Sequence, residues 1–226
     1  MVEFLIYFAI ITLIPIFASM KVRTTYNKYS KVPSSTGATG YDVARRILDA
    51  HGLYDVQIEE IRGVLTDHYD PRAKVVRLSS DIYHGHSLAA IAVAAHECGH
   101  ALQDQEEYAF LRFRSALVPL ASFGSNISWI LILAGIFLTA TNLLLLGIIF
   151  MAFAVLFQVV TLPVEFNASS RAMNQVVSLG LIRNEEEGGA RKVLNAAAMT
   201  YVAAAAVAVI ELLRFILMYF AMNSED

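Results

Sequence analysis

The segment with the clearest chemical potential is His96-Glu97-Cys98-Gly99-His100, which has the pattern HExxH. On a helix, residues four positions apart lie on one face, one turn apart, so the imidazoles of His96 and His100 can bind the same Zn²⁺. Zinc lowers the pKa of a bound water to about 7, and the neighbouring Glu97 can take its proton and pass it to the leaving amine of a peptide bond. The motif predicts a zinc-dependent endopeptidase with Glu97 as general base and His96 and His100 as metal ligands.

Glu165 is the predicted third zinc ligand. A catalytic zinc needs three protein ligands and an open fourth position, and no histidine follows His100 in the sequence. Glu165 directly follows 50 uncharged residues, enough for a transmembrane hairpin that returns the chain to the membrane boundary where the motif lies. Asp104 and Glu107 are too close to the motif, and Glu185–Glu187 suit the first turn of a later helix, where the helix dipole favours anions. The other interpretation of Glu165 is an acidic residue that only marks the end of a span.

The rest of the chain has the composition of a membrane protein. Of its 226 residues, 57% are hydrophobic and 16% are charged, whereas soluble domains have about 25% charged residues. Long runs without charge predict four transmembrane helices, at about 3–20, 115–139, 143–164 and 194–221. The first run could also be a cleaved signal peptide, but it lacks a basic start, so a retained anchor is the favoured interpretation.

The distribution of Lys and Arg predicts the orientation in the membrane. All but one of the 17 basic residues fall in the segments 21–114 and 165–193, and basic residues mark the cytoplasmic side. Both segments, and with them the metal site, are therefore predicted to face the cytoplasm, with both termini outside. The exception, Arg214, lies inside the last predicted span.

The cytoplasmic segment 21–114 predicts a small α+β portion. Its apolar pattern indicates a helix over 40–50, strands over 54–58 and 75–78, and a helix that starts at Ser87 and carries the HExxH motif. The second strand is either an edge to which a substrate adds as a further strand, or an ordinary strand. The expected fold class is a mostly α membrane protein with four transmembrane helices and a small zincin-like α+β portion, forming a single metallopeptidase domain over 1–226.

The remaining features bear on partners. A net charge of −3 is too small to favour nucleic-acid binding, so the expected partners are the lipid bilayer and a protein or peptide substrate.

The single cysteine, Cys98, excludes an internal disulfide and is expected to be a small core residue rather than a nucleophile. The alanines at 203–206 suit close helix packing, within one chain or in a homo-oligomer.

The sequence resembles the YugP family of neutral zinc metallopeptidases of bacterial membranes over nearly its whole length. The stretches that carry the resemblance are Leu65–Arg72, Val93–Gln103, Leu162–Ser169 and Ala190–Ala197. More distantly, it is similar to membrane gluzincins of the HtpX and CAAX-prenyl-protease type. In these relatives the third ligand is a Glu on a helix after a transmembrane hairpin, so the similarity also implies Glu165.

One position departs from the distant relatives. They carry an acidic residue four positions after that Glu, where it supports a zinc-ligating histidine, and here the position is Ser169. The support of the histidines is therefore expected to differ in this chain. Two further roles stay open: His68 is either a loop histidine or a donor to the transition state, and Arg171 either flanks a span or steadies a carboxylate.

A non-catalytic zinc-binding membrane adaptor or assembly scaffold is the alternative to a peptidase. Glu97 argues against this alternative, because a structural zinc site does not need that carboxylate. A closed site with four protein ligands, for example one that recruits His68, would favour it.

Overall fold

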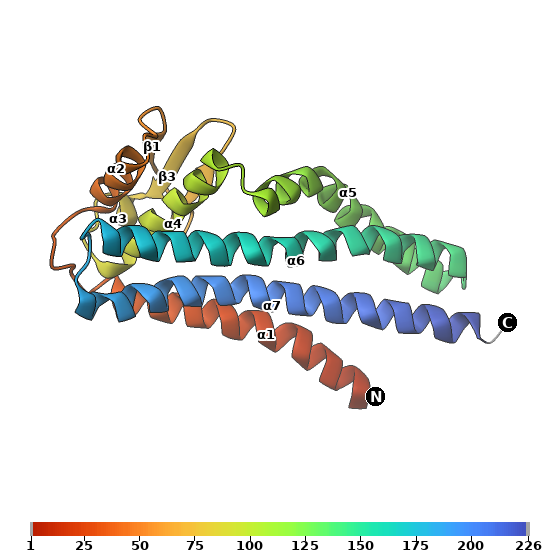
Figure 1. Ribbon diagram of the computed structural model, residues 1–226. Coiled ribbons are helices and arrows are strands. Elements are labelled where there is room, and N and C mark those ends of the chain that lie inside the picture. Colours follow the sequence, from red (N-terminus) through yellow and green to blue (C-terminus); the bar gives the residue numbers. More distant parts are fainter. Residues whose placement is uncertain (1, 225–226) are drawn as a thin grey trace. The chain divides into compact units, whose positions relative to one another are not determined.

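The computed structural model describes residues 2–224 and is mostly helical (Figure 1). Both chain ends are predicted to lie outside the cell. Three residues at these ends, Met1, Glu225 and Asp226, lie outside the described residues. The elements in chain order are α1 (Val2–Tyr29), α2 (Gly40–Ala50), β1 (Gln57–Ile61), β2 (His68–Asp70), β3 (Val75–Ser79), α3 (Ser80–Tyr83), α4 (Leu88–Gln105), α5 (Ala109–Phe137), α6 (Thr141–Ser178) and α7 (Asn184–Asn223).

The chain forms two compact units. One unit, which is made of long apolar helices, comprises the residues up to Phe17, Ala109–Pro163 and the residues from Tyr201 onward. The other unit comprises Ala18–Tyr108 and Val164–Thr200. The second unit contains the sheet and the HExxH motif, so it is the part of the chain that positions the predicted site.

Four helices, α1, α5, α6 and α7, are long and apolar enough to cross a membrane, in agreement with the four predicted spans. These helices extend beyond the predicted limits. α6 continues to Ser178, although its span was predicted to end at 164, and α7 already begins at Asn184, before the predicted 194. The loss of apolar character marks the point where a helix leaves the bilayer, whereas the helix continues in water if its residues favour it. Glu165 therefore lies within α6 and not at its end.

Small residues bring α5 and α6 close together within the first unit. A side chain on Gly135 would collide with the backbone of Leu144, and one on Gly124 would come 2.7 Å from the carbonyl oxygen of Phe150. Such close approach of two backbones is typical of packed transmembrane helices. The two helices therefore form the hairpin that the long uncharged run predicted.

A three-stranded sheet in the order β1-β3-β2 belongs to the second unit. β1 runs parallel to β3 with Gln57 opposite Val75, and β2 runs antiparallel to β3 with His68 opposite Arg77. β3 is thus the central strand and is paired on both sides over 75–77, which favours the interpretation of 75–78 as an ordinary strand. The predicted strand over 54–58 was placed three residues too early, and β2 was not predicted at all.

The helices α2 and α4 begin where the sequence predicted, because both have a side-chain cap. Thr39 and Asp42 form a reciprocal capping box at the start of α2. The side chain of Ser87 accepts a hydrogen bond from the backbone nitrogen of Ala90 at the start of α4. Both helices pack into one apolar core with β3, in which Ile47 is fully buried. This core holds α4, the helix that carries the motif, against the sheet.

Candidate metal centre

Helix α4 carries both histidines of the motif on one face. The centroids of the two imidazole rings are 4.8 Å apart, and the ring planes make an angle of 83°. Apolar residues on the other faces, among them Ile91 and Leu102, are buried in the core. The side chains of His96 and His100 keep exposures of 13% and 12%. The predicted pair of ligands is therefore adjacent and still accessible.

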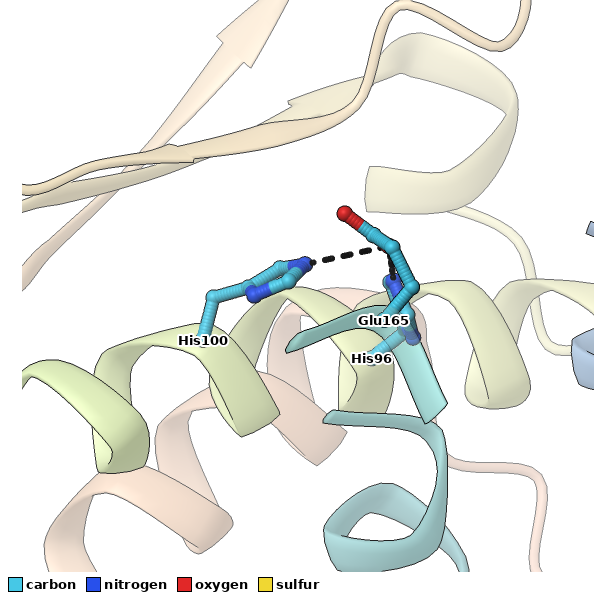
Figure 2. Close-up of side chains that lie close together, drawn as sticks. All are labelled: His96, His100 and Glu165. Carbon is cyan, nitrogen blue, oxygen red and sulfur yellow. Dashed lines mark hydrogen bonds and ion pairs between the residues drawn. The ribbon is translucent and has the colours of Figure 1, made fainter. Parts of the chain in front are cut away.

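Helix α6 places Glu165 against these two rings (Figure 2). Its Oε2 lies 3.2 Å from Nε2 of His96 and 3.6 Å from Nε2 of His100. Within residues 2–224, these three side chains are the one group of His, Cys, Asp or Glu whose ligating atoms converge in this way. The carboxylate is buried. The structure thus brings together all three residues that were predicted as metal ligands.

The distances in this group fit a zinc ion. Two ligands of a tetrahedral zinc, each about 2.0–2.1 Å from the metal, lie about 3.3 Å from each other. The two separations from Glu165 Oε2, 3.2 and 3.6 Å, are close to that value. Two imidazole nitrogens and one carboxylate oxygen are also a donor set that catalytic zinc uses, with one coordination position left open. His96, His100 and Glu165 can therefore hold zinc with small side-chain adjustments.

Gln103 determines which nitrogen of His100 carries the proton. Its Nε2 donates to the carbonyl oxygen of Val164 at 2.8 Å and to Oδ1 of Asn167 at 2.9 Å. A carbonyl oxygen only accepts, so the amide nitrogen of Gln103 must face α6, and its Oε1 must face Nδ1 of His100, which is 3.0 Å away. His100 therefore carries its proton on Nδ1, which leaves Nε2 free to bind a metal.

Arg171 links Asn167 to the exposed side chain of Glu106. Its Nε donates to Oδ1 of Asn167 at 2.7 Å, and its two terminal nitrogens donate to the carboxylate of Glu106 at 2.6 and 2.7 Å. Because arginine only donates, the atom of Asn167 that faces it must be the oxygen, in agreement with the orientation of Gln103. The guanidinium also lowers the pKa of the Glu106 carboxyl. Of the two roles left open for Arg171, the structure thus supports contact with a carboxylate, which is that of Glu106.

Ser169 supports the other histidine. Its hydroxyl oxygen lies 3.2 Å from Nδ1 of His96, one turn of α6 beyond Glu165. A serine hydroxyl can accept the Nδ1 proton, as a carboxylate does in the distant relatives, but without a negative charge. Although Ser169 stands where the distant relatives have an acidic residue, His96 therefore still has a hydrogen-bond partner.

The carboxyl group of Glu97 lies in a buried environment. The residue is only 7% exposed. Burial raises the pKa of its carboxyl, against the lowering influence of His96 and His100. A carboxylate whose pKa is shifted towards neutrality is a better proton acceptor, which suits the predicted role of Glu97 as general base.

The other candidate residues are engaged elsewhere. Asp104 accepts a hydrogen bond from the Tyr69 hydroxyl at 2.7 Å, and Glu186 accepts one from the backbone nitrogen of Ser35 at 2.7 Å. Nδ1 of His68 lies 2.9 Å from a backbone carbonyl oxygen, and His68 is not a member of the converging group. These contacts leave Glu165 as the carboxylate that meets the two histidines.

Cys98 is a core residue, as predicted. It is fully buried, and its Sγ donates to the carbonyl oxygen of Ala44 at 3.7 Å. Burial raises the pKa of its thiol well above the ordinary value. A neutral, inaccessible thiol is a poor nucleophile.

Gly99 allows the motif helix to approach α6. A Cβ atom at this position would lie 2.5 Å from the carbonyl oxygen of Ala168, one turn beyond Glu165 on α6. Backbone cannot yield as a flexible side chain does, so any larger residue must push the two helices apart. The distances between Glu165 and the histidines thus depend on this glycine.

Replacing Gly99 with Ala is expected to lower the free energy of unfolding by about 1–3 kcal/mol, the usual cost of inserting a methyl group into packed structure. It should also weaken zinc binding, because α6 moves away from α4. Thermal unfolding and zinc titration of the purified full chain measure the two effects. Gly188 is the matched control, since a Cβ there meets no atom within 4 Å, and Gly188→Ala should be neutral or stabilising. Wild-type stability and zinc affinity in Gly99→Ala would contradict the close packing described.

Sequence reasoning singled out Ser169 and Arg171 but missed Gln103 and Glu106. Gln103 follows His100 by three positions and therefore shares its helix face, which was a usable signal in an apolar helix. Glu106 offered no such signal, because its contact with Arg171 depends on how α4 and α6 pack.

Comparison with known proteins agrees with these features. The family described as "Putative neutral zinc metallopeptidase" matches residues 4–220. The chain is also 55% identical over 209 residues to "Putative membrane protease YugP" of Bacillus subtilis (strain 168), an alignment that covers 92% of each chain. No solved structure is significantly similar to the chain.

Proposed function

We propose that this chain, which belongs to the neutral zinc metallopeptidase family, is a membrane endopeptidase of gluzincin type. In this proposal His96, His100 and Glu165 hold the zinc, and Glu97 is the general base. The observation that carries the proposal is the convergence of Glu165 Oε2 on the two histidine nitrogens at 3.2 and 3.6 Å. The substrates are peptide bonds of membrane proteins or of proteins close to the membrane.

Zinc and the side chains around it have separate roles in the proposed peptide hydrolysis. Zinc, when bound, supplies a Lewis acid that polarises the peptide carbonyl and lowers the pKa of a water molecule. Glu97 would take a proton from the attacking water and would then pass it to the leaving amine. His100 and His96 are held in the metal-binding tautomer by Gln103 and Ser169.

The test of this proposal is reversible loss of activity on metal removal. Purified full chain in detergent is expected to cleave an unfolded protein substrate, to lose that activity after treatment with a zinc chelator, and to regain it on addition of about one equivalent of Zn²⁺. Peptide cleavage that continues undiminished after the metal has been removed would contradict the proposal.

Gln103 is expected to act as a positioning residue for zinc binding. Gln103→Leu removes the acceptor for the His100 Nδ1 proton, so zinc affinity should fall by about 10–100-fold, the usual effect of losing a group that orients a metal ligand. Competition with a chromophoric zinc chelator measures the affinity. Gln105→Leu is the matched control on the same helix, because the Gln105 amide only donates to the carbonyl oxygen of His51. Equal affinities for the two variants would show that the tautomer of His100 does not depend on Gln103.

The proposal places the metal centre on the cytoplasmic side of the cell membrane. It is supported by the distribution of Lys and Arg, because four spans would put the basic segments 21–114 and 165–193 on the same side of the membrane. Cysteines introduced at Asn142, in the α5–α6 turn region, and at the exposed Tyr54 should react with a membrane-impermeant reagent from opposite sides. Buried Cys98 should give little background. Labelling of both positions from the same side would overturn this orientation.

A further inference from the structure

A basic cleft of about 450 Å³ lies between the end of α1 and the start of α7, within the second unit. Its volume is in the usual range of small-molecule sites, about 300–1,000 Å³. None of its lining residues belongs to the metal centre. The polar side chains that line it are Lys21, Thr24, Thr25, Lys28, Lys192 and Asn195.

The three lysines of this basic cleft have no acidic partner among the residues that the structure describes. Among the described residues, the ammonium groups of Lys21 and Lys192 form no hydrogen bond or ion pair, and Lys28 only lies 5.6 Å from the ring centre of Tyr29. No acidic side chain lines the cleft. Three positive charges therefore face one space without compensation, which favours an anionic ligand.

The basic cleft lies at the edge of the apolar part of both helices. Lys21 directly follows the uncharged run that ends at Met20, and Lys192 directly precedes the uncharged run that begins at Val193. Charged residues next to such runs lie at the level of the lipid headgroups. Met199, which also lines the cleft and is 51% exposed, lies about 10 Å further along α7 into the uncharged run. The basic cleft thus has lysine side chains near one end and the apolar side chain of Met199 near the other.

We propose that this basic cleft binds the phosphate headgroup of an anionic phospholipid. The lysines contact the phosphate, the hydroxyl and amide groups donate further hydrogen bonds, and the acyl chain lies against Met199. Basic pockets between transmembrane helices bind lipid headgroups in this way. A free phosphate ion would match the lysines but not the apolar end, and an acidic peptide would have to enter at headgroup depth.

Native mass spectrometry of the purified full chain in a neutral detergent tests the proposal, with separate titrations of phosphatidylglycerol and phosphatidylcholine. We expect selective retention of phosphatidylglycerol. Lys28→Gln/Lys192→Gln should weaken its binding by about 30-fold, since each lysine near a membrane surface contributes about fivefold. Arg23→Gln/Arg191→Gln is the matched control, because it removes one charge from each of the same helices at exposed positions outside the cleft. The control should change the affinity by less than about twofold.

Three results would overturn the proposal. Equal weakening in both double variants would mean that the lipid responds to general surface charge. Unchanged binding in Lys28→Gln/Lys192→Gln would place the lipid elsewhere. Displacement of the lipid by inorganic phosphate at equal concentration would assign the basic cleft to a phosphate ion. Thermal unfolding of both double variants verifies that they are folded, so a loss of binding is not a loss of structure.

Discussion

Replacing Glu97 with Gln is expected to lower kcat for peptide cleavage by about 10²–10⁴-fold, the contribution that general acid–base catalysis makes. The amide retains the size and hydrogen-bonding shape of the buried side chain, but it cannot accept a proton from water. Zinc should stay bound, because the three metal-binding side chains are unchanged. Steady-state kinetics and metal analysis of the same preparation measure both quantities.

Glu185→Gln is the matched control for this substitution. Glu185 is exposed in the first turn of α7 and is not a member of the converging group. The same chemical change there should leave kcat and zinc content at wild-type values. If Glu97→Gln retained zinc and cleaved at the wild-type rate, Glu97 would not be the general base and the mechanism would be wrong.

Replacing Glu165 with Ala is expected to abolish stable zinc binding. The substitution removes one of three ligands, so the loss should exceed the roughly 10–100-fold that accompanies removal of a supporting residue. A loss of more than 100-fold corresponds to more than about 2.7 kcal/mol of binding free energy. Competition with a chelator of known affinity, followed by metal analysis, provides the measurement.

Two further variants make the Glu165 result specific. Glu165→Asp keeps the carboxylate but draws it back by one methylene, so its zinc affinity should fall between those of wild type and Glu165→Ala. Glu185→Ala, at the exposed position outside the metal centre, should bind zinc as the wild type does. Full zinc occupancy in Glu165→Ala would remove this residue from the set of ligands.

The parts of the site that were predicted depend on local geometry or on topology. His96 and His100 share a helix face because four residues make little more than one turn of any α-helix. The place of Glu165 was predicted from the length of the uncharged run, which is enough for a transmembrane hairpin that returns to the same boundary. The hydrogen bonds from Gln103 to Asn167 and from Arg171 to Glu106 join α4 to α6, so they depend on how the two helices pack and had no sequence signal.

Most helices of the fold were predictable from the sequence, whereas the ends of two long helices and one strand were not. The spans follow from the absence of charge, and α2 and α4 from their caps at Thr39 and Ser87. The ends of α6 and α7 were not predictable from hydropathy, because a helix that leaves the bilayer need not stop there. β2 was missed because its three residues form a strand only through pairing with β3, a contact between distant segments.

X-ray absorption at the zinc edge determines which atoms coordinate zinc in the loaded full chain, and thus whether the site is catalytic. We expect two imidazole nitrogens and a carboxylate oxygen at about 2.0–2.2 Å from the zinc, with the remaining position occupied by water. A closed site with a fourth protein ligand, whether a third imidazole or a thiolate sulfur at about 2.3 Å, would contradict a catalytic centre and favour a structural zinc in a membrane scaffold.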